Sequence, residues 1–405
     1  MRHGRRRGVQ SVLAASVAGL ALVAFNIAPG IAATGHASSA GPAGLTAPEA
    51  NAPVLKSIGK GEGQLNAIAW AGYTQPEWVK PFEATTGCQV NVKYANTSSE
   101  MVSLLANGGG GQYDVVSASG DADLRLIYAG DVRPINISLI PSWKELQPFL
   151  QNPSFNTIAG KHYGVSFEFG PNELLYSTKT FKTPPTSWSV LYDKKYAGEI
   201  TVPDNPIQIA DAALYLSKTD PKLGITDPYE LTQPQFNATV ALLKQEHPLI
   251  KKYWDLASQE ISLFQTGTTV AGAAWPYQTS TLLAAHAPVA ATIPVQGATG
   301  WADTWMLAAK APHPNCAYKW MAYMTTPKVQ AEDAVSYGET PGNKLACPIM
   351  NSISKGSCAA YHANAPASYF QTLKFWKTPL VTCDNGKNDC VPFQDWVTAW
   401  TSITQ

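Results

Sequence analysis

The sequence predicts an α/β protein whose open, mostly parallel sheets are covered by helices. Between residues 64 and 116, three short apolar strand patterns alternate with two amphipathic helical patterns in the order β-α-β-α-β. This alternation favours parallel strands joined by right-handed helical crossovers. The chain has 405 residues, 45% of them apolar, which is enough to bury a large core and to form more than one domain.

The first five elements have recognisable boundaries. We expect strands at 64–70, 88–94 and 113–116 and helices at 76–86 and 97–107. Gly87 follows the first helix as a C-terminal stop, and Pro81 should kink that helix. Thr97 and Glu100 have the spacing of a capping box at the start of the second helix, and Gly108–Gly111 ends it. The segment therefore contains its own start and stop signals.

Two loops of this segment are candidates for a binding site. Ligands of open parallel sheets bind beyond the carboxyl ends of the strands, where the strand order reverses. Trp70 and Tyr73 lie at the end of the first strand, and Ser119 and Asp121 follow the third. We expect these two loops to converge on one cleft.

The rest of the chain continues the mixture of helices and strands. We expect strands at 163–169, 201–203, 270–275 and 304–309, and helices at 207–217, 235–246, 315–325 and 327–337. We find no internal repeat and no apolar run after the N-terminal one that is long enough to cross a membrane.

The first forty residues have the layout of a secretory signal peptide. Arginines at positions 2, 5, 6 and 7 precede an apolar run at 12–25, and small residues follow. An uncleaved membrane anchor is the alternative, although the run is short for a bilayer span. Residues 41–63, rich in Ala, Gly and Pro, are predicted to form a flexible leader. We therefore expect export to the periplasmic or extracellular cell-envelope space.

The charge balance after export bears on the choice of ligand. Removing the four arginines of the signal from 29 basic residues leaves 25, against 29 acidic residues. The mature chain is then slightly acidic, which argues against a nucleic-acid partner and mildly favours cationic ligands.

Six cysteines follow the signal, and an even number in an exported chain indicates disulfides. We expect Cys383 to pair with Cys390 across a turn-rich loop, and Cys347 with Cys358. Cys88 with Cys316 follows by elimination. A zinc site is the alternative, but the chain has no Cys-x-x-Cys motif.

Motifs of enzymes and of nucleotide or metal cofactors are missing. The chain contains no H-E-x-x-H, P-loop, G-x-S-x-G or G-x-G-x-x-G pattern. The run Gly108–Gly111 follows a helix instead of opening one, so it is not typical of a phosphate loop. Glu168 and Glu173 could act as a pair of glycosidase carboxylates, which leaves an exported hydrolase as an alternative. We expect neither catalysis nor a cofactor.

The stretch TGWADTW at residues 299–305 places one acid between two indoles. A cation over an aromatic face gains about 0.5–2 kcal/mol. A carboxylate about 4 Å away adds roughly 4 kcal/mol at an effective dielectric near 20, before desolvation is subtracted. We therefore expect Trp301 to supply a face and Asp303 a counter-charge, while Trp305 packs. The alternative is that Asp303 is an ordinary turn residue before a core strand.

A series of short motifs, in this order, resembles one protein family. The motifs are Trp70-Ala-Gly-Tyr73, Tyr113-Asp-Val-Val116, Trp188, Tyr196-Ala-Gly198, Ala274-Trp275, Trp301-Ala-Asp303 and Thr340-Pro341. Together they resemble the extracellular solute-binding proteins of bacterial ABC importers, most of all the spermidine/putrescine-binding group. The resemblance implies a two-lobed periplasmic-binding-protein fold of type II, with a ligand cleft between the lobes that closes by a hinge motion.

The resemblance also implies domain limits and a site. It places lobe 1 at 64–166, with 300–340 returning to it, and lobe 2 at 167–299, with 341–405 packing on it. In the site, aromatic rings would stack on the ligand, Ser119 would offer a hydroxyl and Asp303 would hold an ammonium group. The implied ligand-binding residues are Trp70, Tyr73, Ser119, Asp121, Asn205, Gln208, Trp275, Trp301, Asp303 and Glu339.

Departures from the family pattern affect the expected ligand. Asn205 and Gln208 stand where spermidine-binding members have two acids, so the binding of a tri- or tetracation should weaken. Asp121, at a position where the family often has tyrosine, or Glu339 could restore one charge. We expect a monomer that passes a small cationic solute, a polyamine or related amine, to the permease subunits of an ABC importer. A sugar ligand of the same fold is the alternative.

Overall fold

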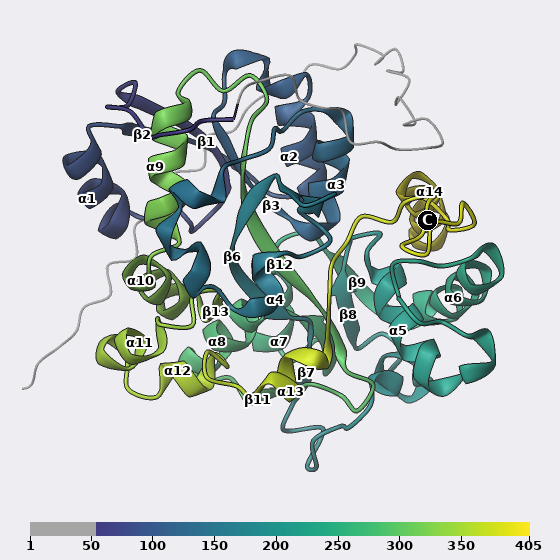
Figure 1. The fold of residues 1–405 in the computed structure, drawn as a ribbon. Coiled ribbons are helices and arrows are strands. Elements are labelled where there is room, and N and C mark those ends of the chain that lie inside the picture. Colours follow the sequence, from purple (N-terminus) through teal and green to yellow (C-terminus); the bar gives the residue numbers. More distant parts are fainter. Residues whose placement is uncertain (1–53) are drawn as a thin grey trace, which may run out of the picture. The chain divides into compact units, whose positions relative to one another are not determined.

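The computed structural model describes residues 54–405, so the predicted signal at 1–40 and most of the leader lie outside the described residues. The described part contains two main sheets, each covered by helices (Figure 1). The first sheet has the order β13 (Thr340–Pro341), β6 (Gly164–Pro171), β12 (Ala298–Leu307), β3 (Val115–Ser119), β1 (Gln64–Trp70), β2 (Gln89–Ala95), with β14 (Leu373–Phe375) paired to β12. The second has the order β11 (Val289–Thr292), β7 (Glu173–Ser177), β10 (Ala271–Ala274), β8 (Ile200–Pro203), β9 (Ile250–Trp254).

Helices cover both faces of the first sheet (Figure 1). Leu65, Ala67 and Ala69 pack with α1 (Pro76–Thr86) and α9 (Pro314–Met324). Ile68, on the other face of β1, packs with α2 (Ser98–Leu105) and α3 (Gly120–Ala129). Because successive side chains of a strand point to opposite faces, both faces of β1 must be apolar. This requirement explains the nearly continuous apolar run of the strand.

The second sheet is covered in the same way. Helices α5 (Gln208–Thr219) and α6 (Gln233–Glu246) lie on one side, and α7 (Ala257–Gln265) and α8 (Pro276–Ala284) on the other (Figure 1). The remaining short elements are β4 (Thr157–Ile158), β5 (Lys161–His162), α4 (Pro148–Gln151), α10 (Pro327–Tyr337), α11 (Cys347–Ile353), α12 (Ser357–Ala360), α13 (Ala367–Gln371) and α14 (Phe393–Thr404).

Local sequence signals fix the ends of the first helices. Gly87 ends α1 in the left-handed conformation with φ 72°. The Thr97 side chain accepts a hydrogen bond from the Glu100 backbone N–H, and Glu100 accepts one from the Asn96 N–H. The predicted order β-α-β-α-β is confirmed. The third strand, however, runs to Ser119, and α3 follows directly.

Both sheets are mixed rather than mostly parallel. In the first sheet β1 runs parallel to β2 and β3, whereas β12 is antiparallel to β3 and β6. In the second sheet β8 is parallel to β9 and β10, whereas β7 is antiparallel to β10 and β11. The physical reason is the connectivity, because β6 and β12 carry the chain directly between the two sheets. β6 leaves the first sheet and β12 returns to it, so β12 runs opposite to both β6 and β3.

A network of buried hydrogen bonds joins the two segments that cross between the sheets. The Asn172 side chain, between β6 and β7, donates to Thr299 Oγ1 of β12 at 2.8 Å. The Thr299 hydroxyl in turn donates to Asp211 of α5, and Asn172 also donates to Asp211. Burial raises the pKa of Asp211 to about 7. These contacts fasten one helix of the second sheet to both segments that pass between the sheets.

The segment 341–405 does not pack on the second sheet as a whole, in contrast to our expectation. The strand Thr340–Pro341 pairs with β6, and the Asn343 side chain donates to Glu145. Helix α11 packs against α10 beside the first sheet. From residue 373 onward the segment also contacts the second half: Leu373 packs with Leu174 and Ala271 of the second sheet, and α14 packs against α6 (Figure 1). The segment is divided in this way because β13 pairs with β6 and β14 pairs with β12, which are strands of the first sheet.

The end of the predicted leader is part of the fold. The Gly59 N–H donates to Asn315 Oδ1 at 2.6 Å, and Glu62 accepts hydrogen bonds from the backbone N–H groups of Asn315 and Cys316. Glu62 therefore caps the start of α9, which places its negative charge at a helix N-terminus. The ordered part begins at least five residues before the expected Gln64.

Three disulfides are present among residues 54–405, and they join the cysteines that we expected to pair. They are Cys88–Cys316, Cys347–Cys358 and Cys383–Cys390. The first of them links the start of β2 to α9 over a sequence separation of 228 residues. It therefore joins two distant parts of the chain around the first sheet.

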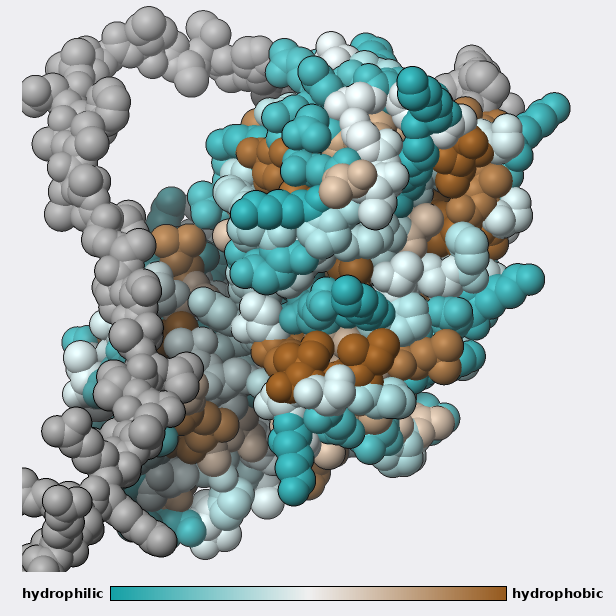
Figure 2. Space-filling model, turned by 90° about the vertical axis from the view of Figure 1, so that its left-hand side faces the viewer, coloured by the Kyte–Doolittle hydropathy of each residue, from teal (hydrophilic) through white to brown (hydrophobic). Residues whose placement is uncertain are grey.

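The surface of the described part carries scattered apolar side chains. On the face in Figure 2, hydrophobic groups lie between hydrophilic ones, with a broader hydrophobic band near the middle. Large exposed apolar residues include Tyr94, Leu283, Val295 and Leu345. Single residues of this kind are ordinary on protein surfaces and do not indicate an interface. Within 54–405, no helix has both the length and the apolar character needed to cross a membrane.

Candidate functional site

Asp303 lies in the middle of β12 and is 3% exposed. Tyr73 Oη donates to one of its oxygens at 2.6 Å, and Ser119 Oγ donates to the other at 2.5 Å. A register shift between β12 and β6 falls beside Asp303, and such bulges redirect side chains. Asp303 is therefore a fixed internal carboxylate rather than a turn residue.

Three further buried acids surround Asp303, and we call Glu168, Asp303, Asp333 and Glu339 the acidic cluster. Tyr73 Oη lies 3.3 Å from Glu339 Oε2 and so connects two of its members. The carboxylate oxygens of Glu168 and Asp333 have no hydrogen-bond partner in the part of the chain that the structure describes. Buried carboxylates without partners are costly unless a cation or a proton neutralises them.

The electrostatics of the acidic cluster favour protons in the absence of a cation. Burial raises the pKa of Asp303 well above its ordinary value, and the nearby charge of Glu339 raises it further. Burial likewise raises the pKa of Glu168 and Asp333, which also repel Glu339 and one another. Burial raises the pKa of Glu339 to about 7. A cation that entered the cluster would stabilise the charged forms and lower these pKa values.

Asp121 adds another buried carboxylate near the cluster. It lies in the first turn of α3, not in a loop as expected, and accepts a hydrogen bond from Ser98 at 2.8 Å. Burial raises the pKa of Asp121 to about 6, against the lowering effects of Ser98, Arg125 and the Asn205 side chain. Asp121 belongs to the first sheet's helices and Asn205 precedes α5 of the second. The two halves therefore meet at this carboxylate.

Tryptophans from three parts of the chain gather beside the acids. Trp275 and Trp301 belong to one apolar cluster with Trp376, and we call these three the indole cluster. The ring centroids of Trp275 and Trp376 lie 6.4 Å apart. Gly170, opposite Trp301 in the sheet, leaves room for that ring, because a Cβ at Gly170 would approach Trp301 to 2.7 Å. By contrast, Trp305 is fully buried in the first core.

The two predicted amides lie at the start of α5. Asn205 Oδ1 accepts from the Ile207 N–H at 3.0 Å, which leaves its NH₂ group available to Asp121. Gln208 is 4% exposed, and its amide nitrogen has no hydrogen-bond partner within residues 54–405. Its interaction lowers the pKa of Asp211, which burial raises. This side of the site therefore offers two amides, with the buried carboxylate of Asp211 next to Gln208.

Of the ten predicted residues, some contact one another directly and others do not. Tyr73, Ser119, Asp303 and Glu339 form one hydrogen-bonded group. Asp121 contacts Asn205 and Trp275 packs with Trp301, while Gln208 lies at the start of α5. Trp70 packs partly buried in the core of the first sheet with Tyr73, and its ring is not tied to the acids.

Sequence reasoning missed Asp333 and Trp376, and it assigned Glu168 only to a hydrolase. Glu168 lies in the buried strand β6, and Asp333 lies on the buried side of α10. An acid inside an otherwise apolar strand or helix face is unusual, and this was the available signal. Trp376 follows β14 and carries no such signal.

One group of surface acids has the spacing of a metal site. Oxygens of Asp227, Glu230 and Asp384 lie within 4.8 Å of one another. Lys377 Nζ, however, lies 2.5 Å from Glu230 and 2.9 Å from Asp384. The lysine therefore already provides the positive charge at this place.

A family model decides the classification. It describes bacterial extracellular solute-binding proteins and matches residues 77–349, more than half of the chain. The chain belongs to this family. This family agrees with the two-sheet architecture of the described residues.

Similar proteins support the same family. The chain is 24% identical over 309 residues to a putrescine/agmatine-binding protein of Pseudomonas aeruginosa, covering 72% of this chain and 82% of the relative. It is 26% identical over 328 residues to the putrescine-binding periplasmic protein PotF of Escherichia coli, covering 76% and 85%. The spermidine/putrescine ABC transporter substrate-binding protein PotD of Streptococcus pneumoniae superposes with a TM-score of 0.67 at 18% identity. This superposition covers 85% of this chain and all of that one. The predicted two-lobed α/β fold is confirmed.

Proposed function

We propose that this extracellular solute-binding protein captures a small amine, a polyamine or a related cation, between its two halves. It then delivers the amine to the permease subunits of an ABC importer. The observation that carries this proposal is the acidic cluster, in which Asp303 is oriented by Tyr73 and Ser119 beside buried acids without a counter-ion. An ammonium group supplies the missing positive charge.

The energetics of such a site are sufficient for useful affinity. Each aromatic face contributes about 0.5–2 kcal/mol to a bound cation. An ammonium group about 4 Å from Asp303 gains roughly 4 kcal/mol at an effective dielectric near 20. Together these terms approach the roughly 8 kcal/mol of a micromolar Kd, before the costs of desolvation and of releasing a proton are subtracted. The indole cluster would contact the methylene groups between the charges.

The names of the related proteins support an amine ligand. The relatives that match over most of their length are described as binding putrescine, agmatine, cadaverine or spermidine. In this chain the amides Asn205 and Gln208 lie across from the acids, so we propose that a diamine binds better than a longer polycation. Lobe 1 would comprise residues 64–166 with 300–340, and lobe 2 residues 167–299.

The protein would act as an exported monomer and would release its ligand unchanged. No step of this function requires a cofactor, a metal or a nucleic acid. The family is extracellular, and we propose the periplasmic or extracellular cell-envelope space as the place of action. The predicted signal peptide would direct this export.

A ligand screen on the purified mature chain tests the proposal. Putrescine, cadaverine, agmatine and spermidine should each be added, with amino acids and neutral sugars for comparison. We expect the amines to raise the melting temperature, because a ligand that binds only the folded state stabilises it. Calorimetry then gives the Kd of each. Stabilisation by a sugar and by none of the amines would overturn the cationic assignment.

A further inference from the structure

The last part of the chain runs from one half of the protein to the other, beyond the residues that the family model matches. We call residues Leu373–Gln405 the C-terminal strap. Its strand β14 pairs in parallel with β12 of the first sheet, and the Trp376 N–H donates to the Gly300 carbonyl at 2.7 Å. Its helix α14 packs against α6 beside the second sheet. The match to the family model ends at residue 349, before the strap begins.

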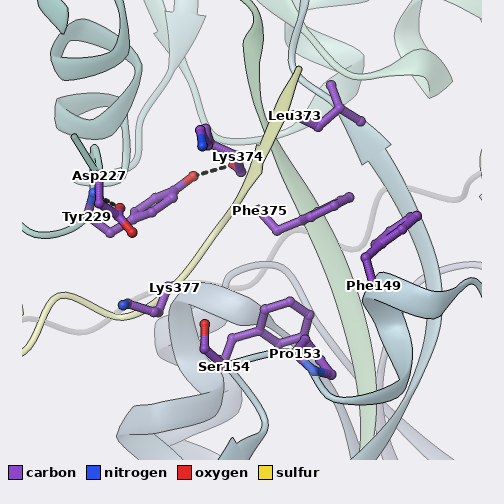
Figure 3. A pocket seen from close by; sticks show the side chains of 10 residues that line it. Phe149, Pro153, Ser154, Asp227, Tyr229, Leu373, Lys374, Phe375 and Lys377 are labelled. Carbon is purple, nitrogen blue, oxygen red and sulfur yellow. Dashed lines mark hydrogen bonds between the residues drawn. The ribbon is translucent and has the colours of Figure 1, made fainter. Parts of the chain in front are cut away.

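The two sides of the strap face different surroundings. Its residues Leu373, Lys374, Phe375 and Lys377 line a pocket of about 240 Å³ that also includes Tyr229 and Phe149. Figure 3 shows the strap between Tyr229 on one side and Phe149 on the other. Trp376, between Phe375 and Lys377, does not line this pocket.

Trp376 points instead to the indole cluster. It is 3% exposed and packs with Trp301 in one apolar cluster. The planes of its ring and of Trp275 meet at 65°, with the centroids 6.4 Å apart. Trp275 comes from the second sheet and Trp301 from the strand that carries Asp303. Trp376 therefore shares one apolar cluster with two rings that we have assigned to the ligand.

The backbone of the strap rests on the first half of the protein. Thr378 Oγ1 donates to the backbone carbonyl of Asp121 at 2.8 Å. The Trp376 carbonyl lies over Gly120, where a Cβ would approach it to 2.0 Å. Only glycine permits this close approach. The strap thus passes directly over the start of α3, which carries the buried carboxylate of Asp121.

Side chains further along the strap fix it to the second half. Lys377 Nζ lies 2.5 Å from Glu230, and Tyr229 Oη donates to the Lys374 carbonyl at 2.7 Å. Trp400 Nε1 donates to Asp204 at 2.7 Å. The strap accordingly holds Trp376 in place from both ends.

We propose that Trp376 is a ligand-contacting residue that determines which amines the site accepts. The proposal rests on the proposed function. Its ring would form a third wall beside Trp275 and Trp301 and would contact the methylene chain or an ammonium group of the amine. The indole would thereby limit the length of the amine that fits.

Substitutions of Trp376 test this role in the full mature chain. We expect Trp376→Leu to weaken putrescine binding roughly tenfold, because an aromatic face is lost, and Trp376→Phe to weaken it less. The ratio of the spermidine to the putrescine Kd should also change, since the wall is smaller. Trp400→Phe is the matched control, because it alters an indole of the strap that binds Asp204 instead of the cluster. Its putrescine Kd should stay within about twofold of wild type.

The outcomes separate this proposal from the proposed function. Circular dichroism first establishes that each variant is folded, and Trp376→Phe decides the matter if Trp376→Leu does not fold. The role of Trp376 alone would be overturned if the wild-type protein bound the amines and the Trp376 variants bound them with the same affinities and the same selectivity. If wild-type protein binds none of the four amines, the proposed function fails, and this inference fails with it.

Discussion

Replacing Asp303 by asparagine should weaken the binding of an amine and at the same time stabilise the empty protein. Asparagine has nearly the same shape, and its Oδ1 can still accept the hydrogen bond from Tyr73. It loses the negative charge that the ammonium group requires. It also loses the unfavourable burial of that charge beside Glu339, which raises the pKa of Asp303. The substitution should therefore lower the affinity for the amine and raise the stability of the empty protein, and a general loss of structure would not produce this combination.

The expected size follows from the geometry of the site. The attraction between the carboxylate and an ammonium group about 4 Å away is roughly 4 kcal/mol at an effective dielectric near 20. Releasing the proton that burial favours offsets part of this gain. We therefore expect a net loss of about 2–3 kcal/mol, which is a roughly 30- to 150-fold increase in the putrescine Kd.

Isothermal titration and thermal unfolding measure the two effects. Glu260→Gln is the matched control, because Glu260 is another fully buried acid, on α7 next to Gly272 of β10. Burial raises its pKa as well, so the control should raise the melting temperature without changing the putrescine Kd. The reasoning would be refuted if Asp303→Asn bound putrescine as tightly as wild type. It would equally be refuted if the control lost as much affinity.

Four further results are expected. Putrescine should bind more tightly as the pH rises from 5.5 to 8. Burial raises the pKa of Glu339 to about 7, and the charged form that appears over this range holds the cation. Titration calorimetry at several pH values measures this change in Kd. The stability of the empty protein should fall over that range, since the folded state holds the extra proton, and constant stability would contradict it. Gly120→Ala should cost roughly 1–3 kcal/mol in urea unfolding, because its Cβ would meet the Trp376 carbonyl at 2.0 Å. Removing the Cys88–Cys316 disulfide by a double serine substitution should lower the free energy of unfolding by roughly 5 kcal/mol, given its 228-residue separation.

Local signals explain what could be predicted of the fold. The first helix and the next two strands follow from short-range rules such as the left-handed Gly87 and the cap at Thr97, which act within one turn of chain. The mixed strand directions could not be read in this way. They depend on β12 returning between β3 and β6, and no residue near β12 records which strands it will join.

In the site, too, the local features could be predicted from the sequence and the long-range contacts could not. A carboxylate two residues from a tryptophan in an apolar strand is visible in the sequence, so Asp303 could be proposed. Its hydrogen bond from Tyr73 spans 230 residues, and the acids Glu168 and Asp333 come from β6 and α10. Only the folded chain brings these groups together, because burial and repulsion depend on the final packing. The family resemblance supplied positions for the site but not these two acids.

The path of the chain between the two sheets also bears on how quickly the protein forms. The first sheet takes strands from residues 64–119, 164–171 and 298–375, while the intervening residues build the second. Neither sheet can be completed until a stretch of more than a hundred residues has been closed into a loop. Proteins dominated by such distant pairings fold slowly. We therefore expect this polypeptide to remain incompletely assembled until β12 and β14 have been synthesised and have joined their partners.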